Sequence, residues 1–194
     1  MSFKLIVITP ESNHPKEIKL VISLFKNGLQ LLHVRKPNFT ETELNAYLQQ
    51  IPKKFYKRIV IHSHYKLANE FNLKGIHLTE QARKGKHISS SYKIISTSFH
   101  NTADILRSRR KYEYVFLSPI YNSISKKGYT SNFDLEELRP FSQKHKNIIA
   151  LGGITTQNIK TIQQAGFFGA AVIGSFWQSK NPEKSYKELL SKIK

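Results

Sequence analysis

Histidine side chains carry the first chemical signal in this sequence, because an imidazole titrates near neutral pH and can both accept and donate a proton. Five of the eight histidines end or follow short apolar runs: His33, His62, His64, His77 and His100. Imidazoles at such positions suit isomerisation by proton transfer. We expect His77, inside an apolar run, to be structural and His64, at a helix start, to be solvated. His100 is the candidate acid or base.

Two pairs of small residues indicate an anion site. Gly152-Gly153 and Gly174-Ser175 each follow an apolar run near the end of the chain, with Ile173 directly before the second pair. Residues without bulky side chains let backbone N–H groups approach an anion closely. Plain turn geometry is the alternative explanation. We predict that both pairs, with Ile173, bind a phosphate group.

Cationic and hydroxyl side chains surround the same predicted site. His33, Arg35 and Lys36 lie at the end of the second apolar run, Ser98 ends the fifth, and Ser123, Ser125 and Lys126 lie in the stretch 119–133. That stretch is the longest without a regular pattern, and such segments are often lids over sites, with a surface excursion as the alternative. We predict that these side chains contact a small anionic substrate.

Carboxylates are scarce where a metal would need them. The chain has only two Asp residues, Asp104 and Asp134, and both are predicted in or beside helices. Magnesium sites usually use one or two carboxylates. Metal-diphosphate chemistry and glycoside hydrolysis by paired acids are therefore poorly supported. The absence of Cys removes cysteine–zinc sites. A zinc site made of histidines alone is the alternative, but the spacing of the histidines is not diagnostic of one, so we predict no metal.

Eight short apolar, β-branched runs are the elements that position these side chains. The predicted strands are 4–9, 31–35, 58–62, 75–79, 93–98, 114–118, 148–152 and 170–174.

Segments with helical periodicity separate the strands. Examples are 17–25, 44–51, 102–111, 134–144, 157–165 and 183–193. Alternating strands and helices imply parallel pairing, and eight such units in 194 residues indicate a minimal (β/α)8 TIM barrel of the α/β class, one domain over 1–194. An open doubly wound sheet is the alternative, but no G-x-G-x-x-G turn follows the first strand.

The net charge of +18 comes from 31 Lys and Arg against 13 Asp and Glu. Because the Lys residues greatly outnumber the Arg residues and spread along the whole chain, we expect small anionic ligands and no nucleic acid. No apolar run approaches the roughly 20 residues that cross a bilayer, so we expect no membrane and a cytoplasmic location. Four aromatic residues, Phe167, Phe168, Phe176 and Trp177, are expected in the core, with an interface between copies in a homodimer as the alternative.

Taken together, these motifs resemble the thiamin phosphate synthase superfamily of TIM barrels, in order along nearly the whole chain. The matching residues are Arg35, Gly75-Ile76-His77-Leu78, Ser98-Phe99-His100, Glu113-Tyr114-Val115, Pro119-Ile120-Tyr121, Lys126-Lys127-Gly128, Ala150-Leu151-Gly152-Gly153-Ile154 and Ala171-Val172-Ile173. The resemblance implies a thiamin biosynthesis enzyme.

Departures from the synthase branch concern its magnesium site. Synthases couple hydroxymethylpyrimidine diphosphate to thiazole phosphate. The resemblance implies the pattern Gln-x-Arg-x-Lys in synthases at the position where this chain has His33-Val34-Arg35-Lys36-Pro37. Their Asn-Asp corresponds to His62-Ser63, and a further Asp corresponds to Ala82. The resemblance therefore implies a cofactor-free relative, with Mg²⁺ required only if the chain is a synthase.

The thiazole tautomerase branch is similar at the same positions. It has His-x-Arg as in His33-Val34-Arg35, a histidine acid/base matching His100, and Lys-Lys-Gly matching 126–128. We predict that His100 aromatises thiazole carboxylate phosphate by proton transfer, while Arg35, with Lys36, holds the carboxylate. Thiamin phosphate synthase (thiamin phosphate pyrophosphorylase) and a non-catalytic regulatory relative are the alternatives.

Overall fold

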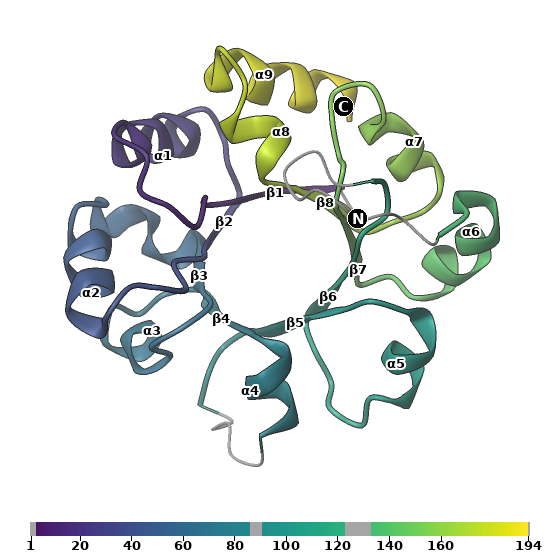
Figure 1. The fold of residues 1–194 in the computed structure, drawn as a ribbon, viewed down its shortest axis with the longest axis horizontal. Coiled ribbons are helices and arrows are strands. Elements are labelled where there is room, and N and C mark those ends of the chain that lie inside the picture. Colours follow the sequence, from purple (N-terminus) through teal and green to yellow (C-terminus); the bar gives the residue numbers. More distant parts are fainter. Residues whose placement is uncertain (1–2, 86–90, 123–132, 194) are drawn as a thin grey trace.

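Eight parallel strands form a closed barrel in the computed structural model, which describes residues 3–85, 91–122 and 133–193 (Figure 1). The strands are β1 (Lys4–Ile8), β2 (Leu31–Val34), β3 (Ile59–Ile61), β4 (Gly75–Leu78), β5 (Ile95–Phe99), β6 (Tyr114–Leu117), β7 (Ile148–Leu151) and β8 (Gly169–Val172). Each lies within two residues of a predicted run.

Pairing of the first strand with the last closes the barrel, with Ile6 opposite Ala171 on one side and Leu31 on the other. All neighbouring strands are parallel, so their carboxyl ends meet at one mouth. This confirms the predicted (β/α)8 fold and excludes the open doubly wound sheet.

Helices form an outer ring around the barrel (Figure 1). They are α1 (Glu17–Lys26), α2 (Glu41–Gln49), α3 (Lys66–Glu70), α4 (Glu80–Lys84), α5 (Thr102–Arg107), α6 (Leu135–Lys144), α7 (Ile159–Gln164), α8 (Gly174–Trp177) and α9 (Pro182–Lys192), with a 3-10 helix at Lys53–Arg58. No helix in the described ranges is long and apolar enough to cross a membrane.

Three helical segments differ from the prediction. The segment 102–111 is helical only to Arg107, because further turns would bring Arg107, Arg110 and Lys111 together at spacings of three and four, where like charges repel. The helix expected at 157–165 begins at Ile159, since the Asn158 side chain instead accepts from Thr155 N at 2.8 Å and holds a turn. The short helix α8 was not predicted.

Aromatic residues of the last unit lie mainly in the core. Phe167, Phe176 and Trp177 are buried, and the Trp177 indole donates to the Ile8 carbonyl at 2.7 Å, which anchors α8 to the carboxyl end of β1. Phe168 is half-buried. The core prediction is confirmed, and these side chains give no support to a dimer interface.

The barrel interior has an apolar side and a polar side. Apolar side chains such as Ile6, Ile149 and Phe116 fill the region around β1 and β6 to β8. Imidazoles and hydroxyls fill the region around β2 to β5, where His33 and His77 are buried. Buried polar groups are stable only when hydrogen-bonded, and the partners of these two are described below.

Candidate active site

A pocket of about 360 Å³ opens at the carboxyl ends of the strands. This volume is in the range of small-molecule sites, and the carboxyl end is where barrels of this fold carry their active sites. The structure brings eight of the predicted site residues together in its lining: Arg35, Ser98, His100, Gly152, Gly153, Ile173, Gly174 and Ser175. Ser123, Ser125 and Lys126 lie outside the described residues.

His100 is held in one orientation by the neighbouring strand. It follows β5, and its Nδ1 lies 2.9 Å from the Ser118 carbonyl oxygen, just after β6. Because a carbonyl only accepts, Nδ1 must carry the proton, and the neutral imidazole then has its lone pair on Nε2. The ring is solvent-exposed and lines the pocket. This geometry suits an acid/base acting through Nε2.

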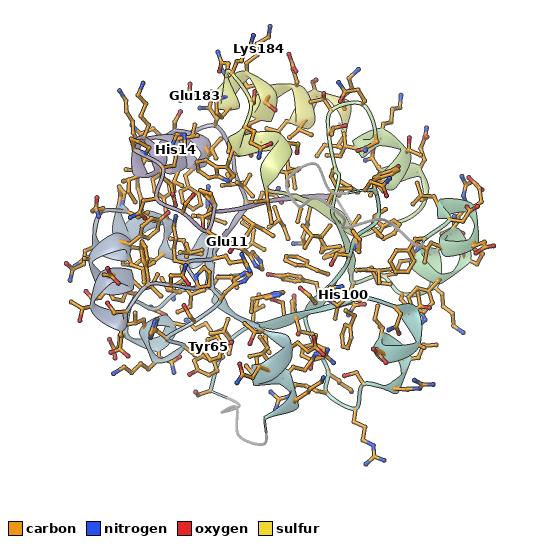
Figure 2. The ribbon with its side chains drawn as sticks, in the orientation of Figure 1. Glu11, His14, Tyr65, His100, Glu183 and Lys184 are labelled. Carbon is orange, nitrogen blue, oxygen red and sulfur yellow. The ribbon has the colours of Figure 1, made fainter. Side chains whose placement is uncertain are left out.

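Arg35 is positioned by its backbone and paired through its side chain. Arg35 N donates to Thr9 Oγ1 at 2.8 Å, and the guanidinium forms an ion pair with Glu11, in the loop after β1. Glu11 also lines the pocket, and Figure 2 shows it on a different side of the opening from His100. Sequence reasoning missed Glu11, although the strand-end rule applied to β1 would have found it.

The donor set of the mouth does not fit the magnesium site of a synthase. The carboxylates in the described lining belong to Glu11 and Glu80, and each is already paired with a cation, Arg35 and Lys84 respectively. The Lys84 partner holds the pKa of Glu80 below its usual value by hydrogen bonding and charge. Ser63 and Ala82, at the two positions where the resemblance implies Asp in a synthase, supply no carboxylate.

The glycine pair after β7 permits a close approach between loops. Gly152 and Gly153 have φ values of +97° and +64°, which favour glycine. A Cβ on Gly153 would lie 2.6 Å from Asn122 O and one on Gly152 would lie 2.8 Å from Pro119 Cα. The φ values and the close loop packing therefore account for both glycines without a ligand, which agrees with the turn geometry named above as the alternative explanation. Phosphate binding at these N–H groups stays a prediction.

The second small-residue pair begins α8 in the same lining. Ser175 Oγ donates to the Ile154 carbonyl at 2.5 Å, which joins the loops after β7 and β8. Backbone N–H groups in the first turn of a helix have no partner within the helix, so those of Gly174 and Ser175 are the donors that a phosphate could use.

The structure corrects the prediction that Lys36 contacts the substrate. Lys36 does not line the pocket; its Nζ is fully buried, 2.7 Å from Glu17 Oε2 and 3.0 Å from the Ser12 carbonyl. Tyr47 donates to the other Glu17 oxygen at 2.7 Å. Successive residues of an extended chain point to opposite sides, so Lys36 faces the helices while Arg35 faces the mouth. The structure therefore places Lys36 in a buried ion pair behind the pocket, and we expect it to stabilise the fold.

The structure also corrects the prediction that His33 contacts the substrate, because His33 is fully buried and does not line the pocket. Its Nδ1 is 2.9 Å from His62 Nε2, and its Nε2 is 2.7 Å from the Tyr114 hydroxyl. Burial holds the pKa of both His33 and His62 well below the usual value, and nearby His77 adds to the effect. The structure therefore places His33 in the layer beneath the pocket lining, in contact with His62 and Tyr114.

His77 connects the pocket to the interior. Its Nδ1 is 2.9 Å from Ser96 Oγ and its Nε2 is 3.0 Å from Ser98 Oγ. Burial, with the charge of Arg35, lowers its pKa to about 3. His77 and His62 both line the pocket, although the sequence favoured a structural place for His77.

His64, the fifth of these histidines, bonds the Phe39 carbonyl at 2.7 Å through Nε2 and has a φ of +48°. It precedes α3 and lies outside the pocket lining.

A closed (β/α)8 barrel with a small-molecule pocket at its carboxyl mouth is the class that this fold and site define. The sequence model of the family described as thiamine monophosphate synthase matches residues 5–176. The chain belongs to that family.

Individual relatives agree with this family. Thiamine phosphate pyrophosphorylase from Bacteroides thetaiotaomicron, known from a crystal structure, has 34% sequence identity to this chain. The structural match covers 98% of this chain and 97% of that chain, with a TM-score of 0.84. Thiamine-phosphate synthase 1 of Streptococcus pneumoniae is 25% identical over 88% of this chain and 87% of its own length. Thiamine-phosphate synthase of Prochlorococcus marinus is 27% identical over the full chain, which spans 57% of that relative's length.

Proposed function

We propose that the chain is an isomerase of the thiazole tautomerase type, which aromatises thiazole carboxylate phosphate without a cofactor. The observation that carries the proposal is the bond from His100 Nδ1 to the Ser118 carbonyl, which leaves Nε2 as the proton acceptor in a pocket that Arg35 also lines. Nε2 takes a proton from the non-aromatic ring, and the imidazolium returns one to the exocyclic carbon. The product has the same atoms as the substrate, so the reaction consumes and releases nothing else.

The remaining lining residues supply binding in this proposal. The Arg35 guanidinium holds the substrate carboxylate and stabilises the negative charge that develops as the proton leaves. Backbone N–H groups of Gly152, Gly153, Gly174 and Ser175 hold the phosphate. Ser98, which His77 orients at 3.0 Å, offers a hydroxyl to the ring.

Thiamin phosphate synthesis is the second candidate, because the relatives described above carry that name. Such an enzyme joins hydroxymethylpyrimidine diphosphate to thiazole phosphate with release of diphosphate. Ser63 and Ala82, at the two positions where the resemblance implies Asp in a synthase, carry no carboxylate, which speaks against the magnesium site that this reaction needs.

Parallel assays of the two reactions discriminate between the candidates. Aromatisation of thiazole carboxylate phosphate is followed by NMR, and coupling of the two thiamin precursors is followed as thiochrome fluorescence, each with Mg²⁺ and again with EDTA. The proposal predicts aromatisation that EDTA leaves unchanged. Robust Mg²⁺-dependent coupling without aromatisation would overturn it.

A further inference from the structure

Three imidazoles from three successive strands meet in the barrel interior. His33 lies on β2, His62 directly follows β3 and His77 lies on β4, and all three are buried. One ring nitrogen from each residue lies within 4.8 Å of a ring nitrogen of both others. We propose that these residues form a binding site for one divalent transition-metal ion, of the class of Zn²⁺, Co²⁺ and Ni²⁺.

The spacing of the nitrogens suits such an ion. Zinc–nitrogen bonds of about 2.0–2.1 Å at tetrahedral angles place ligand nitrogens about 3.3 Å apart. His33 Nδ1 and His62 Nε2 lie 2.9 Å apart, which is slightly less than this value. The nitrogens of all three histidines lie within 4.8 Å of one another, which allows some pairs to be farther apart than this value. Small movements of the side chains are enough to close the site, and the ion replaces the proton shared by His33 and His62.

Outer partners hold the rings in place for ligation. The Tyr114 hydroxyl binds His33 Nε2 at 2.7 Å, which turns Nδ1 toward His62. Ser96 binds His77 Nδ1 at 2.9 Å, and the ion would take the place of the Ser98 hydroxyl, which lies 3.0 Å from His77 Nε2. Histidines that ligate metals usually use their second nitrogen in this way.

The donor chemistry and the pocket define what else the ion would bind. Imidazole nitrogens suit transition metals, whereas Mg²⁺ takes oxygen ligands. Because His62 and His77 line the pocket, a fourth coordination position would open toward it, as in catalytic three-histidine sites. The nearby Arg35 cation opposes a bare dication and favours an anionic fourth ligand such as hydroxide, carboxylate or phosphate. This inference does not depend on the proposed isomerase activity.

Co²⁺ titration of the whole chain tests the site, with any polyhistidine tag removed and prior metal stripped by EDTA and dialysis. Visible d–d absorption reports the Co²⁺ geometry, and equilibrium dialysis with Zn²⁺ gives the stoichiometry. We expect one equivalent, bound in a tetrahedral or five-coordinate environment. Purely octahedral spectra, or no binding at stoichiometric concentrations, would overturn the site.

Variants locate the bound ion. His62→Asn should abolish stoichiometric binding, and Tyr114→Phe, which keeps the ring and removes the outer partner, should weaken binding about 10–100-fold. His145→Asn, at the end of α6, should bind as the wild type does. If His62→Asn fails to fold by circular dichroism, Tyr114→Phe decides. Wild-type affinity in the folded His62→Asn variant, or in Tyr114→Phe, contradicts the assignment.

Discussion

Glu11 forms an ion pair with Arg35 at the rim of the pocket, so a carboxylate of the protein occupies the guanidinium to which we assign the substrate carboxylate. An incoming anion therefore competes with Glu11 for the guanidinium. The pair is partly exposed, with side-chain exposures of 33% for Arg35 and 48% for Glu11, and such pairs contribute about 1 kcal/mol or less.

Glu11→Gln should therefore lower the KM for an anionic substrate by up to about fivefold, because it removes this competitor from Arg35. Steady-state kinetics at low ionic strength measure the change, and added salt should shrink it. Glu183→Gln removes one negative charge from α9, away from the opening in Figure 2, and should leave KM unchanged. A raised KM in Glu11→Gln would show that Glu11 assists binding.

Lys36→Met should destabilise the fold by about 3–5 kcal/mol, because it leaves the buried Glu17 carboxylate without its cation. Urea denaturation followed by circular dichroism measures the loss. The double variant Lys36→Met, Glu17→Gln should recover much of it, since neither charge then stays unpaired. Equal stability of Lys36→Met and the wild type would contradict the structural role.

Gly153→Ala should destabilise the protein more than Gly28→Ala does. Both glycines have positive φ, +64° and +94°, but a Cβ at 28 meets nothing within 4 Å, whereas one at 153 lies 2.6 Å from Asn122 O. Gly28→Ala thus measures backbone strain alone, about 1–3 kcal/mol. The additional loss in Gly153→Ala, measured by thermal unfolding, reports the contact between loops. Equal losses would mean that the loops simply move apart.

In EDTA, the free energy of unfolding should fall as pH decreases from about 6.5 to 5. Burial lowers the pKa of His77 to about 3, so in this window the unfolded chain binds more protons than the folded chain does. Each buried histidine contributes up to about 1.4 kcal/mol per pH unit. The ordinary pKa of a carboxyl group lies near 4, below this window. Urea denaturation at pH 7, 6 and 5 should show the slope in the wild type and a shallower one in His62→Asn; a flat wild-type profile would contradict the low pKa.

The strands and the mouth were predictable because buried parallel strands have apolar, β-branched runs and because their polar ends gather at one side. Arg35 and Lys36 show where this reasoning stops. Both are cations at a strand end, and only the direction of each side chain separates a pocket residue from a buried partner of Glu17. The convergence of His33, His62 and His77 likewise depends on barrel closure and strand register, which sequence spacing does not contain.

Replacement of His100 tests the central claim most directly. His100→Asn retains a side-chain amide that can donate to the Ser118 carbonyl but removes the titrating group. Initial rates of aromatisation of thiazole carboxylate phosphate, measured by NMR beside the control His145→Asn, should fall about 10²- to 10⁴-fold in His100→Asn alone. An unchanged rate in His100→Asn would contradict proton transfer by this histidine.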